Sequence, residues 1–173
     1  MHREIKLSLI NIIYLFLKII NDKPFSMFFN FFLNNSFHII FWYRISHSLV
    51  RTPFKIISRV INAFVRIIYS CDISPFSYIG KNCIIMHGFD IVIGSNVYIG
   101  DNTKIFNGVT LGNRKGSHGD GQPTIGRNCM LGTGAKILGN IDIGNDCKIG
   151  ANSVVLKSFS SGSTVVGNPA ISI

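Results

Sequence analysis

The feature that most limits how this chain can fold is a six-residue repeat in its second half. From residue 79 onward an aliphatic residue returns every six positions, with two interruptions, and glycine follows eight of these twelve positions. The twelve are Ile79, Ile85, Ile93, Ile99, Ile105, Leu111, Ile125, Leu131, Ile137, Ile143, Ile149 and Val155. A second, often small residue follows four positions later at Cys83, Val97, Thr103, Val109, Cys129, Ala135, Ile141, Cys147 and Ser153. An α-helix cannot produce a six-residue period, whereas a triangular coil of parallel β-strands can.

Three such hexads complete one triangular coil. Each aliphatic side chain then fills a corner of the interior, and the glycine that follows allows the tight turn between two faces. Twelve hexads predict about four coils, and the second residue of each hexad is expected to point inward as well. The repeat therefore predicts a mainly β domain built as a parallel β-helix.

The repeat is interrupted twice, and each interruption predicts a loop that leaves the regular coil. Ile85 and Ile93 are eight residues apart instead of six, and His87 lies in the excess. Leu111 and Ile125 are fourteen residues apart, so eight extra residues form an insertion within NRKGSHGDGQPT. A regular coil cannot hold these residues inside. We expect both loops to project from the surface, where binding and chemistry are usually found.

The first 70 residues differ in composition from the rest. They carry nine Lys or Arg against Glu4 and Asp22, and they hold ten of the fourteen phenylalanines. Residues 71–173 carry eight basic and six acidic residues. We therefore divide the chain into an N-terminal helical segment, residues 1–70, and a β-helix domain, residues 71–173.

Local signals predict two helices in the later part of the helical segment. Ser36 is expected to cap a helix that begins at Phe37, and Thr52 to cap a second helix with Pro53 at its first position. Along residues 54–68 an apolar stripe recurs at a spacing of three and four, at Ile57, Val60, Ile61, Phe64, Ile67 and Ile68. Two interpretations stay open: the stripe packs on other helices and the β-helix, or this basic and aromatic surface lies on anionic lipid.

The N-terminal apolar run and the cysteines indicate in which cellular compartment the protein is expected. The run from Leu7 to Ile20 contains Ser8, Asn11 and Lys18 and is shorter than the roughly 20 apolar residues of a spanning helix. No small-residue cleavage site follows it, so we expect a mature, cytoplasmic segment and not a signal peptide. The four cysteines form no CxxC pair and three occupy inward positions of the repeat. They favour a reducing compartment and give no indication of a structural metal site.

Several stretches of the second half carry a specific family resemblance. DISPFSYIGKNCIIMHGFDIVIG is followed by VTLGNRKG, QPTIG, GTGAKILGNIDIG, KIGANSVV and VVGNPA, and FHIIFWYRISH precedes them. Together these motifs resemble the serine acetyltransferase family of left-handed β-helix acyltransferases, which use acetyl-CoA and no metal. HG followed by an aromatic residue and VI is most similar to the subgroup found with colanic acid and capsular polysaccharide synthesis. The resemblance implies a left-handed β-helix and an O-acetyltransferase activity.

The resemblance also implies the catalytic residues. In the family, a histidine in the first irregular coil is the general base and an aspartate orients it; the matching residues here are His87 and Asp72. A hydroxyl is too weak an acid to attack a thioester unaided, so a base with a near-neutral pKa must take its proton. A carboxylate on the other ring nitrogen fixes the tautomer and stabilises the imidazolium. No cysteine lies beside His87, which favours direct attack without an acetyl-enzyme.

The family binds acetyl-CoA in the groove between neighbouring subunits of a trimer. The amide that faces the thioester oxygen belongs by position to Asn113. Lys148 matches a position that contacts a CoA phosphate in the family. Alternatively, it is an ordinary solvated lysine on the coil surface. The expected CoA-binding residues are Gly112, Asn113, Thr133, Gly134, Ala135, Lys148 and Ala151. We therefore expect a homotrimer with active sites between subunits, and no nucleic-acid partner.

The acceptor positions depart from the family pattern. The Arg–His pair that holds an amino-acid carboxylate corresponds to Gly121 and Gln122, and the carboxylate before the catalytic histidine corresponds to Met86. Recognition of a carboxylate favours a guanidinium fork, whereas a sugar hydroxyl needs only neutral donors and acceptors. The candidate acceptor-binding residues are Gln122, Asp90, Asn107 and Asp22.

The sequence alone leaves three functions open. The first is an acetyl-CoA-dependent O-acetyltransferase acting on a sugar of surface polysaccharide, such as capsule, colanic acid or O-antigen. The second is a serine O-acetyltransferase in cysteine biosynthesis, and the third is a non-catalytic trimeric β-helix scaffold. For the first, the basic helices add the expectation of peripheral contact with the inner membrane face.

Overall fold

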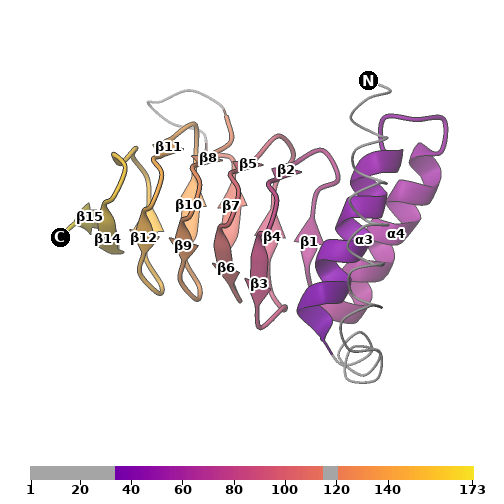
Figure 1. Ribbon diagram of the computed structural model, residues 1–173, viewed down its shortest axis with the longest axis horizontal. Coiled ribbons are helices and arrows are strands. Elements are labelled where there is room, and N and C mark those ends of the chain that lie inside the picture. Colours follow the sequence, from indigo (N-terminus) through magenta and orange to yellow (C-terminus); the bar gives the residue numbers. More distant parts are fainter. Residues whose placement is uncertain (1–33, 115–120) are drawn as a thin grey trace.

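The computed structural model describes residues 34–114 and 121–173 and consists of a β-helix with two α-helices at one end (Figure 1). The helices are α3 (Asn35–Leu49) and α4 (Lys55–Tyr69), and β1 begins at Asp72. Each of the first four coils contributes one strand to each of three sheets in turn. The parallel β-helix predicted from the repeat, with helices before it, is confirmed.

The three sheets form the faces of the prism. Sheet A holds β1 (Asp72–Ile73), β4 (Val92–Ile93), β7 (Thr110–Gly112), β10 (Lys136–Leu138) and β13 (Val154–Val155). Sheet B holds β2 (Tyr78–Ile79), β5 (Tyr98–Ile99), β8 (Thr124–Ile125) and β11 (Asp142–Ile143). Sheet C holds β3 (Ile84–Met86), β6 (Lys104–Phe106), β9 (Met130–Leu131), β12 (Lys148–Ile149), β14 (Thr164–Gly167) and β15 (Ala170–Ser172). Neighbouring strands are parallel except for β14 and β15, whose antiparallel pairing closes the C-terminal end.

The interior of the prism consists of the residues that the repeat predicts. All twelve aliphatic positions are at most 2% exposed, and all nine second positions are at most 9% exposed. The four cysteines are free and buried. Burial of this continuous aliphatic column is the main stabilising contribution to the domain.

The strand register places both interruptions where the sequence predicts them. Asp72 pairs with Val92, twenty positions on, whereas Val92 pairs with Thr110, eighteen positions on. The two extra residues therefore lie between β3 and β4, in the turn of His87. Tyr98 pairs with Thr124, twenty-six positions on, so the eight extra residues lie between β7 and β8.

The two helices begin at other caps than the sequence predicts. Asn34 caps α3 in place of Ser36, because its Oδ1 accepts the Phe37 N–H at 3.2 Å. No side chain caps α4, which begins at Lys55; Thr52 Oγ1 instead accepts the Phe54 N–H at 3.2 Å and closes the preceding turn. Both predictions are wrong for the same reason, since neighbouring polar side chains and turns compete for the first free amides of a helix.

Helix α3 covers the open edge of the first coil. Arg44 donates from Nη1 to the Ile79 oxygen at 2.6 Å and from Nη2 to the Gly80 oxygen at 2.5 Å. The Tyr43 hydroxyl donates to the Ser77 oxygen at 2.8 Å, and burial raises the pKa of this tyrosine. A coil edge without partners would leave buried backbone groups unsatisfied. These contacts fix α3 on the β-helix and bring its N-terminus beside the turn of His87.

Helices α3 and α4 pack on each other through a face other than the predicted stripe. Ser46 and Ser58 are buried between them, and each hydroxyl donates to the other residue's carbonyl oxygen, at 3.0 and 2.9 Å. Ser58 and Val65 are the buried residues of α4. Of the predicted stripe, Ile61 alone is partly buried against the core. We call the large exposed side chains of this segment the α4 face: Phe54, Ile56, Ile57, Val60, Phe64, Ile67 and Ile68, which are 48–82% exposed.

Candidate active site on one edge of the prism

The turns that lead from sheet C to sheet A stack into one continuous edge. They comprise residues 87–91, 107–109, 132–135 and 150–153, and we call them the His87 edge. The Gly108 N–H donates to the Phe89 oxygen at 3.2 Å, and the Gly134 N–H donates to the Asn107 oxygen at 2.9 Å. The Asn152 N–H continues the ladder to the Thr133 oxygen at 2.8 Å. Parallel stacking thus brings residues 65 positions apart onto one line, because each coil repeats the path of the previous one.

Most of the site residues expected from the sequence lie on this edge. They are His87, Asp90, Asn107, Thr133, Gly134, Ala135 and Ala151. Thr133 Oγ1 and Asn107 Oδ1 lie 3.2 Å apart and hydrogen-bond across neighbouring turns. Gly108 and Gly134 have φ angles of +70° and +71°, so side chains are disfavoured at both positions. The Ala135 side chain is completely buried inside the prism, and its N–H and carbonyl both bond within the coil stack; its role in CoA binding stays a prediction.

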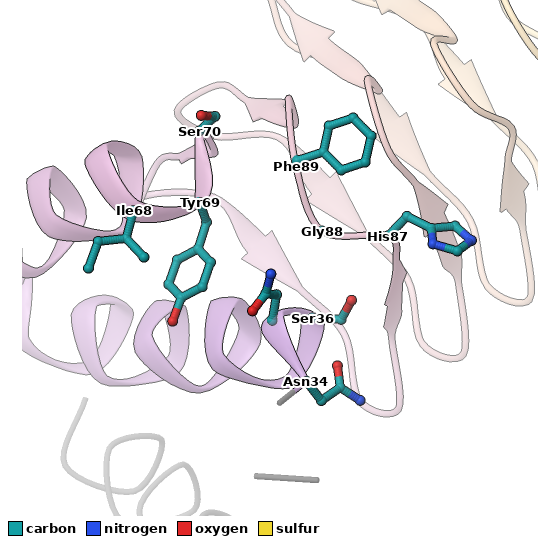
Figure 2. A pocket seen from close by; sticks show the side chains of 9 residues that line it. Asn34, Ser36, Ile68, Tyr69, Ser70, His87, Gly88 and Phe89 are labelled. Atoms are coloured by element: carbon teal, nitrogen blue, oxygen red, sulfur yellow. The ribbon is translucent and has the colours of Figure 1, made fainter. Parts of the chain in front are cut away.

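His87 projects from the wider turn between β3 and β4. The Phe89 N–H donates to the His87 oxygen at 2.9 Å and His87 has a φ of +56°, so the turn is tight and the imidazole is exposed. A Cβ on Gly88 would overlap Ile39 Cδ1 and lie 3.4 Å from Ser36 Cα. Glycine at this position therefore lets the start of α3 approach the turn. Figure 2 shows the imidazole pointing away from the helices, toward the coils that follow.

Asp72 does not hydrogen-bond to His87 within the described part of this single chain. Its Oδ2 instead lies 3.7 Å from Arg66 Nη1, in an ion pair whose side chains are both about half exposed. Arg66 lies in the last turn of α4. The expected Asp72–His87 pair is thus absent here because Asp72 faces the end of α4 while the His87 ring points the other way.

Gly112, Asn113 and Gln122 lie on a second edge, between sheets A and B, which we call the loop edge (residues 112–114 and 121–123). Asn113 Oδ1 accepts the Gly121 N–H at 3.1 Å and so ties the two ends of the insertion together. Gln122 packs over Gly94, where a Cβ would come within 2.8 Å of its Oε1. Within one chain, sheet A separates these residues from His87. Asp22 lies outside the described residues.

Two lysines differ in their position relative to the two edges. Lys148 is exposed on the outer face of sheet C, in register with Met130 and Thr164, and so lies on neither edge. Lys136 was missed by sequence reasoning, although its Nζ donates to the Gly108 oxygen at 2.7 Å and to Thr110 Oγ1 at 3.0 Å. The repeat could have indicated Lys136, because this residue follows the inward Ala135, points outward from sheet A and pairs with Thr110.

An open cavity of about 590 Å³ lies between the start of α3, the end of α4 and the His87 turn (Figure 2). Tyr69 borders it, and its hydroxyl is 2.8 Å from His38 Nδ1. The described lining residues are Asn34, Asn35, Ser36, Ile68, Tyr69, Ser70, His87, Gly88 and Phe89. None of these residues is Asp, Glu, Lys or Arg, so the cavity suits a polar, uncharged group. In the described ranges, no three His, Cys, Asp or Glu side chains gather closely enough to hold a metal ion.

Comparison with known proteins identifies the repeat and the chain. A family model described as "Bacterial transferase hexapeptide (six repeats)" matches residues 122–157, and one described as "Hexapeptide repeat of succinyl-transferase" matches residues 90–114. The serine acetyltransferase of Helicobacter pylori (strain ATCC 700392 / 26695) is 41% identical over 136 residues, which is 79% of this chain and 80% of that protein.

Solved structures give the same result for the fold. The serine acetyltransferase of Brucella abortus strain S19 in complex with coenzyme A superposes with a TM-score of 0.80 at 36% identity, over 90% of this chain and 64% of that one. Soybean serine acetyltransferase complexed with serine superposes with a TM-score of 0.80 at 32% identity, over 91% of this chain and 66% of that one. This chain therefore spans about two thirds of the length of those proteins.

The comparisons support the expected family but not the expected subgroup. They do not support the closer similarity to the colanic acid and capsule subgroup, because the matching relatives are named serine acetyltransferase. They do support the family and the fold, over most of the chain. The chain belongs to the serine acetyltransferase family of hexapeptide-repeat acyltransferases.

Proposed function

We propose that this chain transfers the acetyl group of acetyl-CoA to a hydroxyl group, with His87 as the general base. One observation carries the proposal: the exposed His87 turn lies between an open cavity on one side and the stacked backbone turns of the His87 edge on the other. An extended thioester along the edge would lie on the side to which the imidazole points, and a hydroxyl acceptor would approach from the cavity across the His87 turn. The Brucella relative is described in complex with coenzyme A, which supports this choice of donor.

The proposed reaction needs one proton transfer and one acyl transfer. The His87 imidazole accepts the proton of the acceptor hydroxyl as its oxygen attacks the thioester carbonyl carbon. Negative charge then develops on the carbonyl oxygen, and a backbone amide such as that of Asn113 stabilises it. The carbon–sulfur bond breaks, the acetyl ester leaves, and the CoA thiolate takes up the proton from the imidazolium.

A neighbouring subunit would complete the site. Within one chain the loop edge and the His87 edge are separated by sheet A, so Asn113 cannot act on a thioester held at its own His87. We infer a homotrimer in which the loop edge of one subunit faces the His87 edge of the next. Mixing His87→Ala chains with Asn113→Pro chains tests this arrangement, because the mixed assembly restores some complete sites while either variant alone has none. Asn113→Ala, which keeps the N–H, is the control and retains activity.

L-serine is the first candidate acceptor, because the relatives are named serine acetyltransferase and the soybean structure is described with serine. The second candidate is a neutral sugar hydroxyl of a surface polysaccharide precursor. It is favoured by the uncharged lining of the cavity and by Gly121 and Gln122, which stand where the family has an Arg–His pair.

Thioester consumption by the purified full-length chain separates these acceptors. Rates with acetyl-CoA are measured with L-serine and with neutral mono- and oligosaccharides at equal concentration. A turnover on L-serine far above that on sugars establishes the first candidate; the reverse establishes the second. Met86→Asp restores a carboxylate beside His87 and is expected to lower the KM for L-serine, while a sugar acceptor gains nothing from it. Absence of transfer to any hydroxyl acceptor would contradict the proposal and favour the scaffold function.

A further inference from the structure

The α4 face holds seven of the sixteen large apolar side chains that are exposed in the described part of the chain. Its seven side chains come from one helix and the turn before it, and Ile67 is 82% exposed. Contiguous exposed apolar surface of this kind marks a binding site in soluble proteins. The face lies at the end of the molecule opposite the C-terminus, away from the regular faces of the prism (Figure 1).

The charges around this face restrict what can cover it. Residues 34–71 contain five Lys or Arg and no Asp or Glu. Counting about 100° per residue, Lys55, Arg59 and Arg66 fall within about 40° of one another, between the apolar face and the side that packs on α3. Arg66 pairs with Asp72, while Lys55 and Arg59 are exposed. The helix therefore presents an apolar strip with cations along one flank.

This pattern favours an anionic partner over the other possible occupants. A second copy placed face to face would bring two identical cationic flanks together, with no carboxylate on either helix to neutralise them. Residues 1–33 of the same chain also carry a net positive charge, from Arg3, Lys6, Lys18 and Lys23 against Glu4 and Asp22, so they would not neutralise these cations. An anionic lipid surface complements both parts of the face, because acyl chains take up the apolar strip and phosphates attract the cations.

We propose that the α4 face binds the surface of an anionic lipid bilayer and holds the enzyme there peripherally. No helix in the described ranges is long and apolar enough to cross a bilayer, and the proposal needs none. The face ends at the candidate active site, since Ile68 belongs to it and also lines the cavity beside His87. Binding would thus hold the cavity close to acceptors at the membrane surface. The proposal does not depend on which acceptor is used.

The first experiment asks whether lipid covers the α4 face. Ile67→Cys places a thiol at its most exposed position, and the four native cysteines are buried, so background labelling is low. With the full-length chain, a thiol reagent should modify this site rapidly without vesicles and at least tenfold more slowly with vesicles of phosphatidylglycerol and phosphatidylcholine. Lys81→Cys on the β-helix, also exposed, is the control and should react equally in both conditions.

Either of two labelling results would overturn the proposal. If the introduced thiol is unreactive without vesicles, residues 1–33 or a second copy already covers the face. If it reacts and the vesicles give no protection, the face does not meet lipid.

The second experiment tests the role of charge by flotation. The wild-type chain should float with the anionic vesicles at low salt and not with phosphatidylcholine alone. Lys55→Gln/Arg59→Gln should lower partitioning about tenfold to thirtyfold, from the usual contribution of two basic residues near an anionic surface. The matched pair Lys81→Gln/Arg127→Gln removes two exposed cations from the β-helix and should change partitioning little. Equal losses in both pairs, or flotation that does not respond to salt, would contradict binding through α4.

Discussion

The β-helix and the helical segment obtain their partners in opposite ways. In the β-helix each residue meets its equivalent in the next coil: Asn82 Nδ2 donates to Asn102 Oδ1, Asn102 to Asn128, and Asn128 to Asp146, at 3.2, 3.2 and 3.0 Å. All four have φ between +55° and +59°, so one strained turn is repeated and bonded to itself. In α4, by contrast, one side packs on α3 and the other stays largely exposed, with a ring contact from Phe64 to Trp42 of α3 at its margin.

This difference separates two kinds of surface. The β-helix is complete in its own interior, and what it offers outward is an edge of open backbone turns that positions His87. The helical segment is incomplete in the described chain, and what it offers outward is apolar area and positive charge. Chemistry is therefore expected to respond to changes on the prism edge, and association to changes on α4.

The largest expected effect separates the two surfaces by activity. His87→Ala should lower turnover by roughly 100-fold to 10,000-fold, because the acceptor hydroxyl loses its general base. The side chain is exposed and has no hydrogen bond within the described residues, so stability should not change. Ile67→Gln on α4 should leave turnover on a soluble acceptor unaltered. Steady-state thioester consumption measures both, and full activity in His87→Ala would refute the proposed mechanism.

A matched pair of truncations compares the two regions by stability. Leu131→Ala removes a completely buried side chain from the prism and should lower the free energy of unfolding by about 2–5 kcal/mol. Phe64→Ala removes a larger side chain that is 48% exposed and should cost less than about 1.5 kcal/mol. Urea unfolding of the full-length chain measures both. Equal losses would mean that the α4 face is already buried in solution by another part of the protein.

Period and register explain why the prism could be predicted from the sequence residue by residue. A hexad that recurs twelve times identifies every inward position, and its two irregularities locate the His87 turn and the insertion. The same register places Asn107, Thr133 and Ala151 on the edge of His87. It also places the Ala135 side chain inside the prism.

The parts that were not predictable depend on contacts without a period. The ion pair of Asp72 with Arg66 joins a strand to a helix through two flexible side chains, and no local pattern signals it. The stripe on α4 shows amphipathic spacing, but spacing cannot tell which face packs on α3. In this protein the face of α4 that packs on α3 is the one with a small buried residue, since Ser46 and Ser58 let the two helices approach.

Two glycines with the same backbone conformation distinguish the His87 edge from an ordinary turn. A Cβ on Gly134, whose φ is +71°, would overlap Asn152 Oδ1 on the edge. A Cβ on Gly162, whose φ is +79°, would meet nothing within 4 Å. Gly162→Ala should therefore cost only the backbone strain, about 1–2 kcal/mol. Gly134→Ala should cost as much and should also weaken CoA binding severalfold, as measured by calorimetry. Unchanged CoA affinity in Gly134→Ala would remove this turn from the binding surface.

The smallest expected effect is a pH dependence that belongs to the prism alone. Burial raises the pKa of the Cys129 thiol from 9.0 to about 11, because the thiolate would lose its solvation inside the coil. The folded state thus keeps the proton that the unfolded chain releases, so this stabilising contribution is complete below pH 9 and falls as the pH rises toward 11. We expect a loss of about 1–2 kcal/mol between these limits.

Cys129→Thr tests the assignment of that pH dependence, because Thr103 occupies the equivalent inward position one coil earlier and is completely buried. The hydroxyl does not titrate in this range, so urea midpoints of the variant should fall less steeply with pH than those of the wild-type chain. Cys71 and Cys83, whose pKa values burial also raises, leave a residual slope. Identical slopes in the two proteins would show that the loss of stability at alkaline pH arises elsewhere. The basic helical segment would then be the next region to test, with Lys55→Gln/Arg59→Gln.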